Sequence, residues 1–119
     1  MTIQEKVLLA AKALLDKKAE DVSAVEIDSL SVITDYMVFA TATSSTHIRA
    51  LGDAVEKAFS DLGIEPHHRE GKSTGWVLLD YTDFIVHIFT KKEKEFYNLD
   101  RLWADGKPVD LSKLEGSDE

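Results

Sequence analysis

The chain has 119 residues, a length that suits one compact domain and is too short for two. Apolar residues make up 44% and charged residues 30%, which is the balance of a globular rather than a disordered protein. The 14 Lys and Arg against 22 Asp and Glu give a net charge of −8, which argues against affinity gained by neutralising phosphates and is compatible with a basic protein partner. The absence of cysteine excludes disulfides, thiolate metal sites and cysteine catalysis. No apolar run approaches membrane-spanning length, and the N-terminus lacks the features of a secretory signal, so we expect a cytoplasmic protein.

The N-terminal part of the chain predicts one helix followed by two strands. Thr2 and Glu5 have the spacing of a capping box, in which each side chain bonds a free backbone amide of the first turn. Apolar residues then recur at helical spacing and predict an amphipathic helix over residues 3–18. Residues 22–28 and 36–43 are rich in β-branched and aromatic side chains, which predicts two strands. The short connection between them favours antiparallel pairing.

A second helix, three strands and a short helix are predicted in the rest of the chain. Ser44, Ser45 and Thr46 offer N-cap hydroxyls to a helix that ends near Leu62, where Gly63 provides the stop. The remaining predicted elements are strands over 66–69, 76–80 and 84–89 and a helix over 91–97, which Thr90 would cap.

This order of elements favours an α/β (α+β) fold. We expect a five-stranded mixed sheet with the two main helices packed on one face and a short C-terminal helix, because each main helix has a single apolar stripe. We also expect a single domain over residues 1–103 and a polar, acidic C-terminal tail over residues 104–119.

Two short patterns that resemble catalytic motifs have plainer interpretations. Residues 71–75 combine glycines, a lysine and hydroxyls, but a P-loop has four residues between its glycines and precedes a helix, whereas a strand follows here. A hairpin turn is therefore favoured. Asp80 and Asp83 flank a second tight turn, where aspartates commonly accept hydrogen bonds from nearby backbone amides. We expect no catalytic residue and no cofactor.

The four histidines do not form a recognisable metal site. His67 and His68 are adjacent, so on a strand they point to opposite faces and do not share one metal ion. His47 lies on the second predicted helix and His87 on the last predicted strand. We expect surface or core-edge histidines and no bound metal.

An aromatic and acidic strip in the strand over 76–80 is the best candidate binding surface. Trp76, Leu78 and Asp80 share one face of this strand by the alternation of side chains, and Tyr81 is expected to extend the patch. An Asp on the same face as Trp and Leu is unusual for a core and normal for a polar-rimmed binding surface, where Trp and Tyr are frequent hot spots. The alternative is that Trp76 covers the sheet edge or packs under a terminal helix. The residues alone leave both interpretations open.

Several stretches together carry a resemblance to a known family. They comprise residues 15–21, Asp35-Tyr36-Met37-Val38-Phe39-Ala40, Glu70-Gly71, Gly75-Trp76-Val77-Leu78-Leu79-Asp80-Tyr81, Asp83, Val86-His87, Glu95-Phe96-Tyr97, Leu99 and Arg101-Leu102-Trp103. In this order, over roughly residues 3–103, they resemble the ribosomal silencing factor family, also called the Iojap family.

The resemblance implies a mixed-sheet α/β domain, similar in topology to nucleotidyltransferases but without their chemistry. It further implies binding to the large ribosomal subunit through ribosomal protein fourteen, which obstructs the small subunit and lowers translation under nutrient limitation. Sequence-specific contact with nucleic acid and contact with a membrane are not implied. Because some members pair as dimers, a homodimer stays open.

Carried onto this chain, the resemblance also suggests binding residues. The family's surface motif matches Trp76, Leu78, Asp80 and Tyr81, and nearby family positions match Asp35, Tyr36 and Glu70. Thr82 stands where a glycine is frequent in the family, which suggests a less strained turn here.

Two other classes of function remain as alternatives. A nucleotidyltransferase-like enzyme generally has paired aspartates two residues apart to hold two Mg²⁺ ions, whereas Asp80 and Asp83 are three apart. A generic protein-binding adaptor that acts away from the ribosome is the other alternative.

Overall fold

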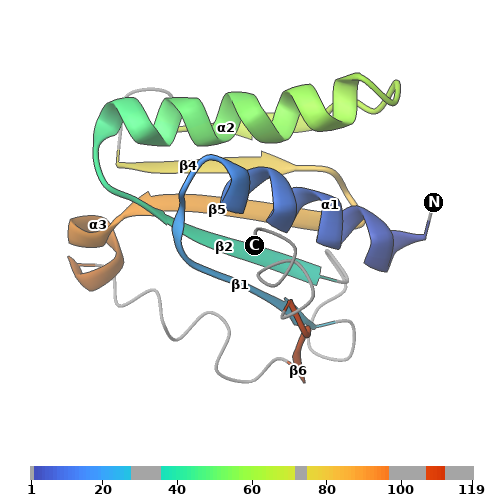
Figure 1. The fold of residues 1–119 in the computed structure, drawn as a ribbon, viewed down its shortest axis with the longest axis horizontal. Helices are drawn as coiled ribbons and strands as arrows, with labels where there is room; N and C mark the ends of the chain where they lie inside the picture. The colour runs from blue at the N-terminus through green and yellow to red at the C-terminus, as the bar shows by residue number, and fades with distance from the viewer. Residues whose placement is uncertain (1, 28–35, 72–74, 97–106, 112–119) are drawn as a thin grey trace.

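A six-stranded mixed sheet organises the computed structural model of the chain, which describes residues 2–27, 36–71, 75–96 and 107–111 (Figure 1). The strands are β1 (Glu20–Glu26), β2 (Tyr36–Ala42), β3 (His68–Glu70), β4 (Trp76–Asp80), β5 (Phe84–Thr90) and β6 (Lys107–Pro108). The helices are α1 (Ile3–Asp16), α2 (Ser45–Ser60) and α3 (Lys91–Phe96). Across the sheet the strand order is β3-β4-β5-β2-β1-β6.

Helix α1 begins where its sequence predicts. The Thr2 backbone N–H donates to Glu5 Oε1 at 2.8 Å, and the Glu5 backbone N–H donates to Thr2 Oγ1 at 3.1 Å, so the capping box is formed. The buried residues of the helix follow the predicted stripe and are Val7, Ala10, Ala11 and Leu14.

Helix α2 is limited by the expected residues at both ends. Ser44 caps it by accepting from the His47 backbone N–H at 3.1 Å. Its regular hydrogen bonding ends at Ser60, and Gly63 then adopts φ 77°, a left-handed conformation in which glycine has no steric cost. The chain thereby turns back toward β3.

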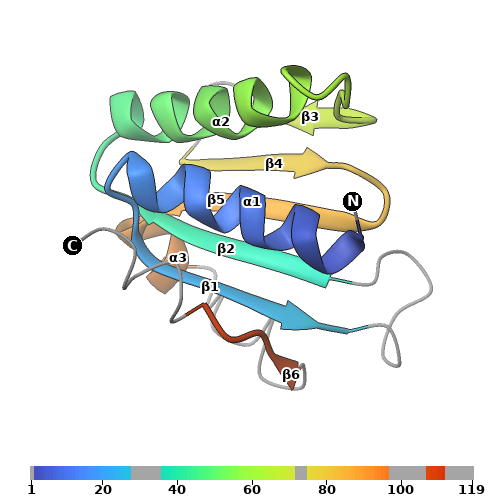
Figure 2. The same ribbon diagram turned by 45° about the vertical axis from the view of Figure 1, so that its right-hand side comes forward.

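Helices α1 and α2 cover the same face of the sheet, as the sequence predicts (Figures 1 and 2). The main core lies between them and the central strands, and its largest fully buried members include Leu14, Leu51, Phe59, Leu79 and Phe84. A smaller core lies on the other face and consists of Val25, Ile27, Phe39 and Phe89, with Met37 and Trp76 packed against it. The sheet therefore has a larger apolar core under α1 and α2 and a smaller apolar core on its other face.

The pairing of the strands explains the connections. Strands β1 and β2 pair antiparallel as predicted, with a register irregularity between Glu20 and Ser23. Strands β2 and β5 pair in parallel, so the chain must cross over between them, and α2 lies within that crossover. Strands β3, β4 and β5 form an antiparallel meander that brings β4 beside β5.

The sheet has six strands rather than the expected five. The additional strand, β6, pairs antiparallel with the edge of β1 through Lys107 and Pro108, and the Val109 backbone N–H donates to the Ala24 carbonyl at 2.8 Å. Two residues that include a proline give no strand pattern in the sequence, because proline has no N–H and suits only an edge. Residues 107–111 fall in the segment expected to be a tail, yet Val109 and Leu111 pack on the main core.

Candidate functional site

The face of the sheet opposite α1 and α2 carries the expected strip. Trp76, Leu78 and Asp80 are half-buried and alternate with the buried Val77 and Leu79. In the register of β3 and β4, Glu70 lies beside Leu78 and His68 beside Asp80. Directly paired residues share a face, so β3 adds one predicted residue, Glu70, and one unpredicted residue, His68. We call Trp76, Leu78, Asp80, His68 and Glu70 the β3–β4 strip.

The outer end of the β3–β4 strip is polar and exposed. His68 Nε2 lies 2.7 Å from Glu70 Oε1, and both side chains are more than half exposed. Solvent screens such a pair, so it adds little to stability. The two-residue spacing in β3 was the signal for His68, since side chains two apart on a strand share a face.

Trp76 lies over a buried histidine. Its indole Nε1–H donates to His87 Nδ1 at 3.2 Å, and the two ring centroids are 5.9 Å apart. His87 is only 5% exposed and stacks on Phe39 with ring centroids 5.3 Å apart and an interplanar angle of 11°. The Trp76 side chain is therefore the partly exposed member of a three-ring cluster, tilted by 46° to His87, rather than a free surface ring.

The protonation of His87 follows from this geometry. Burial lowers the pKa of His87 from 6.5 to about 4, so the ring is neutral at pH 7. An indole N–H only donates, so Nδ1 must be the acceptor and the ring proton lies on Nε2. His87 Nε2 is buried and has no hydrogen-bond partner within the described ranges.

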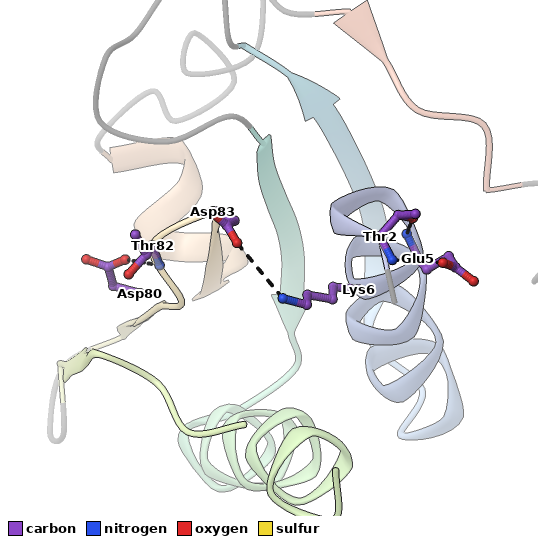
Figure 3. A network of polar contacts seen from close by, with 6 residues as sticks. All are labelled: Thr2, Glu5, Lys6, Asp80, Thr82 and Asp83. Atoms are coloured by element: carbon purple, nitrogen blue, oxygen red, sulfur yellow. Dashed lines mark hydrogen bonds and ion pairs between the residues drawn. The ribbon is translucent and has the colours of Figure 1, made fainter. Parts of the chain in front are cut away.

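Asp80 stabilises the turn that follows β4. Its Oδ1 accepts from the Thr82 backbone N–H at 2.8 Å, whereas Asp83 Oδ2 lies 3.9 Å from Lys6 Nζ on α1 (Figure 3). The two aspartates thus have separate partners and do not converge as a metal-binding pair would. The Asp80 contact is the local hydrogen bond expected from the turn sequence, whereas the partner of Asp83 is a lysine distant in sequence.

The turn is strained at Thr82, contrary to the expectation of a less strained turn. Thr82 has φ 74°, in the left-handed region. A β-branched side chain is a steric outlier there, because its Cβ approaches the following carbonyl. Threonine therefore adopts here a conformation that glycine would accept without steric cost.

Tyr81 does not extend the patch, which corrects the expectation from the sequence. It is 8% exposed and packs in the main core, with ring centroids 4.8 Å from Phe59 and 4.9 Å from Phe84. The alternation of side chains places residue 81 with Val77 and Leu79, on the face opposite Trp76. Burial raises the pKa of Tyr81, and its hydroxyl has no hydrogen-bond partner among the described residues.

Tyr36 does not join the β3–β4 strip. Tyr36 is half-buried against the main core, and its hydroxyl donates to Glu26 Oε2 at 3.2 Å. Strand β2 is separated from β4 by β5, so Tyr36 differs from Trp76 in both face and strand. Asp35 lies outside the described residues.

The hairpin between β3 and β4 determines where β4 begins, at Trp76. Gly71 has φ 89°, and a Cβ at this position would collide with the Trp76 backbone carbonyl. Only glycine accommodates this approach. Strands β3 and β4 pair antiparallel on either side of this segment, which confirms the predicted hairpin, although residues 72–74 lie outside the described residues.

Two properties of the described residues bear on the class of site. Within them, no group of three or more His, Asp or Glu side chains is arranged to hold a metal ion. No helix among them has the length and apolar character needed to span a bilayer.

The fold and the site define an α+β protein with one helix-covered sheet face and an aromatic, acidic strip on the other. The family model described as "Ribosomal silencing factor during starvation" matches residues 1–119. The ribosomal silencing factor of Halalkalibacterium halodurans is 38% identical to this chain over 112 residues, and that of Bacillus subtilis is 35% identical to it over 104 residues. These matches cover 93% and 87% of this chain and 96% and 88% of the relatives.

A solved structure supports the same assignment. The crystal structure of a protein from Chromobacterium violaceum matches with a TM-score of 0.83 at 31% identity, over 92% of both chains. The chain belongs to the ribosomal silencing factor family. The resemblance drawn from the motifs and the mixed-sheet α+β fold class are thereby confirmed.

Proposed function

We propose that this protein binds the large ribosomal subunit through ribosomal protein fourteen and keeps the small subunit from joining. Family membership supports ribosome silencing, and the relatives' names refer to that role rather than to a reaction. The observation that carries the site is the β3–β4 strip, where a half-buried Trp76 lies among polar residues on the face that α1 and α2 leave uncovered.

The mechanism needs no catalysis. A large ring buries much area for a small loss of conformational entropy, which makes Trp76 the main anchor of the proposed contact. Asp80 and Glu70 add negative charge elsewhere on the same strip, which suits a basic protein surface. The bound domain then excludes the small subunit sterically, so translation in the cytoplasm falls with the fraction of large subunits that carry the protein.

Subunit joining tests this proposal directly. Purified large subunits are saturated with the protein, small subunits are added, and the joined-particle peak is followed on a sucrose gradient. We expect the peak to fall in proportion to occupancy. An undiminished peak at saturated binding would show that steric exclusion is wrong.

Co-sedimentation separates this function from a generic adaptor. We expect the protein to pellet with large subunits and not with small subunits, which serve as the matched control. Equal recovery with both would favour an adaptor without ribosomal specificity. Sedimentation of the protein alone measures whether it also pairs as a homodimer.

A further inference from the structure

We propose that His87 is a positioning residue for partner binding, which holds the Trp76 indole in the orientation that the β3–β4 strip presents. This inference rests on the proposed function, because it assigns a role within the same site. It adds a buried residue to a surface that the sequence described only by its outward side chains.

The first support is the contact itself. The Trp76 Nε1–H donates to His87 Nδ1 at 3.2 Å, and His87 stacks on Phe39 below it. Strand pairing places Leu78 beside His87 and Trp76 beside Phe89, so the indole leans along the sheet to reach the histidine. A hydrogen bond at one end and packing on the small core at the other leave the ring little rotational freedom.

The second support is the unfavourable position of the histidine. His87 Nε2 is buried without a hydrogen-bond partner within the described ranges. Such an atom loses its hydrogen bonds to water without forming one in the protein, which costs free energy. The neighbouring positions of the same core, Phe39 and Phe89, carry phenylalanine, which would fill the site without an orphaned nitrogen. The Nδ1 acceptor is the one feature that histidine adds over phenylalanine here.

The arrangement also restricts how Trp76 meets its partner. Its only polar hydrogen is already donated within the protein. The partner therefore contacts the ring through apolar groups or through a cation on its face, which fits a basic protein. Pre-orientation raises affinity because less freedom is lost on binding.

The first measurement is the Trp76 indole N–H resonance in a nitrogen–proton correlation spectrum, which is independent of any partner. A Trp103→Phe background leaves Trp76 as the single tryptophan. We expect His87→Phe, which keeps a ring and removes the acceptor, to move this resonance upfield. His87→Asn, which retains an acceptor oxygen at the δ position, should restore part of the shift.

Thr41→Val is the matched control for these variants. Thr41 is buried on the same face, and its hydroxyl also has no hydrogen-bond partner among the described residues. The substitution changes a buried polar atom in the same core without touching the indole contact. We expect neither the Trp76 resonance nor the affinity to change.

The second measurement is affinity for large subunits, combined in a double-mutant cycle. We expect His87→Phe to weaken binding about three- to tenfold, the range of one lost hydrogen bond, with partial recovery in His87→Asn. In a Trp76→Ala background the same substitution should have no effect, because nothing remains to be positioned. A general loss of structure would instead lower affinity equally in both backgrounds.

The outcomes separate the two proposals. An unmoved Trp76 resonance in His87→Phe, or full affinity despite a moved resonance, overturns the positioning role and leaves the proposed function standing. Full affinity in Trp76→Ala overturns Trp76 as the binding anchor, and with it the role of His87. No binding by the unmodified protein overturns the proposed function itself.

Discussion

Trp76 is the residue at which binding and stability overlap. Its ring packs on the small core and bonds His87, yet it remains partly exposed beside polar residues. A fully exposed tryptophan would affect binding alone, and a core tryptophan would affect folding alone. The structure places it between these limits.

The first prediction concerns Trp76→Ala. We expect a loss of at least about 2 kcal/mol in binding free energy, roughly thirtyfold in affinity, as for a hot-spot residue. Because part of the ring is buried, we also expect about 1–3 kcal/mol of lost stability, less than for a full core truncation. Denaturant melts and binding of the folded fraction measure the two effects separately. Unchanged affinity of that fraction would remove Trp76 from the site.

The second prediction concerns the pH dependence of stability. Burial lowers the pKa of His87 to about 4 in the folded protein, against 6.5 for an ordinary histidine. Between these values the unfolded chain binds a proton that the folded chain does not, so stability falls as the pH drops from about 6.5 to 4. One such group contributes at most about 1.4 kcal/mol per pH unit.

Denaturant melts from pH 7.5 to 4.5 measure this dependence. Other groups titrate in the same interval, so the informative quantity is the difference between the unmodified protein and His87→Phe. We expect the variant to have the shallower dependence and the Thr41→Val control to keep the full one. If stability depended on pH equally in the unmodified protein and in His87→Phe, His87 would be protonated equally in the folded and unfolded states.

Among the elements, the turn between β4 and β5 contains the clearest local conflict. The Asp80 carboxylate holds the Thr82 backbone N–H, while Thr82 itself adopts a positive φ. The hydrogen bond and the antiparallel pairing of β4 with β5 maintain a conformation that threonine resists.

The third prediction follows from this conflict. Thr82→Gly should raise the free energy of unfolding by up to about 1 kcal/mol, since relief of left-handed strain of about 1–2 kcal/mol exceeds the added flexibility of the unfolded chain. Thr82→Ala keeps a Cβ and serves as the control, with a smaller gain. Equal gains in both variants would assign the effect to the threonine branch rather than to the backbone conformation.

At the scale of the whole molecule, net charge shapes the approach to a partner. The chain carries −8, and Glu70 lies exposed at the outer end of the β3–β4 strip. Charges at the rim of an interface act mainly on the association rate, and salt screens them.

The fourth prediction is that association with the large subunit slows as salt rises from low to physiological concentration. Glu70→Lys should slow association more than it speeds release. Glu95→Lys changes the net charge equally but lies on α3, outside the strip, and serves as the matched control. Equal slowing in both variants would indicate steering by overall charge alone, and an association rate independent of salt would contradict steering.

The sequence by itself determined the local structure and the family. The capping box of α1, the Ser44 cap of α2 and the strand over Trp76–Asp80 all agree with the structure, because short-range hydrogen bonding and side-chain periodicity set them. The alternation in β4 also placed Trp76, Leu78 and Asp80 on one face, and the ordered motifs identified the ribosomal silencing factor family.

Only the tertiary structure decided what lies behind and beside that strip. The pairing of β4 with β5 places His87 under Trp76, and the pairing of β3 with β4 adds His68 and puts the predicted Glu70 on the same face. The local sequence pattern also did not predict that β6 pairs with the edge of β1. Tyr81 is buried because it lies on the face of the sheet that α1 and α2 cover. These contacts join residues distant in sequence, and their energy depends on the register between strands and on which face the helices bury, neither of which a single strand's pattern specifies.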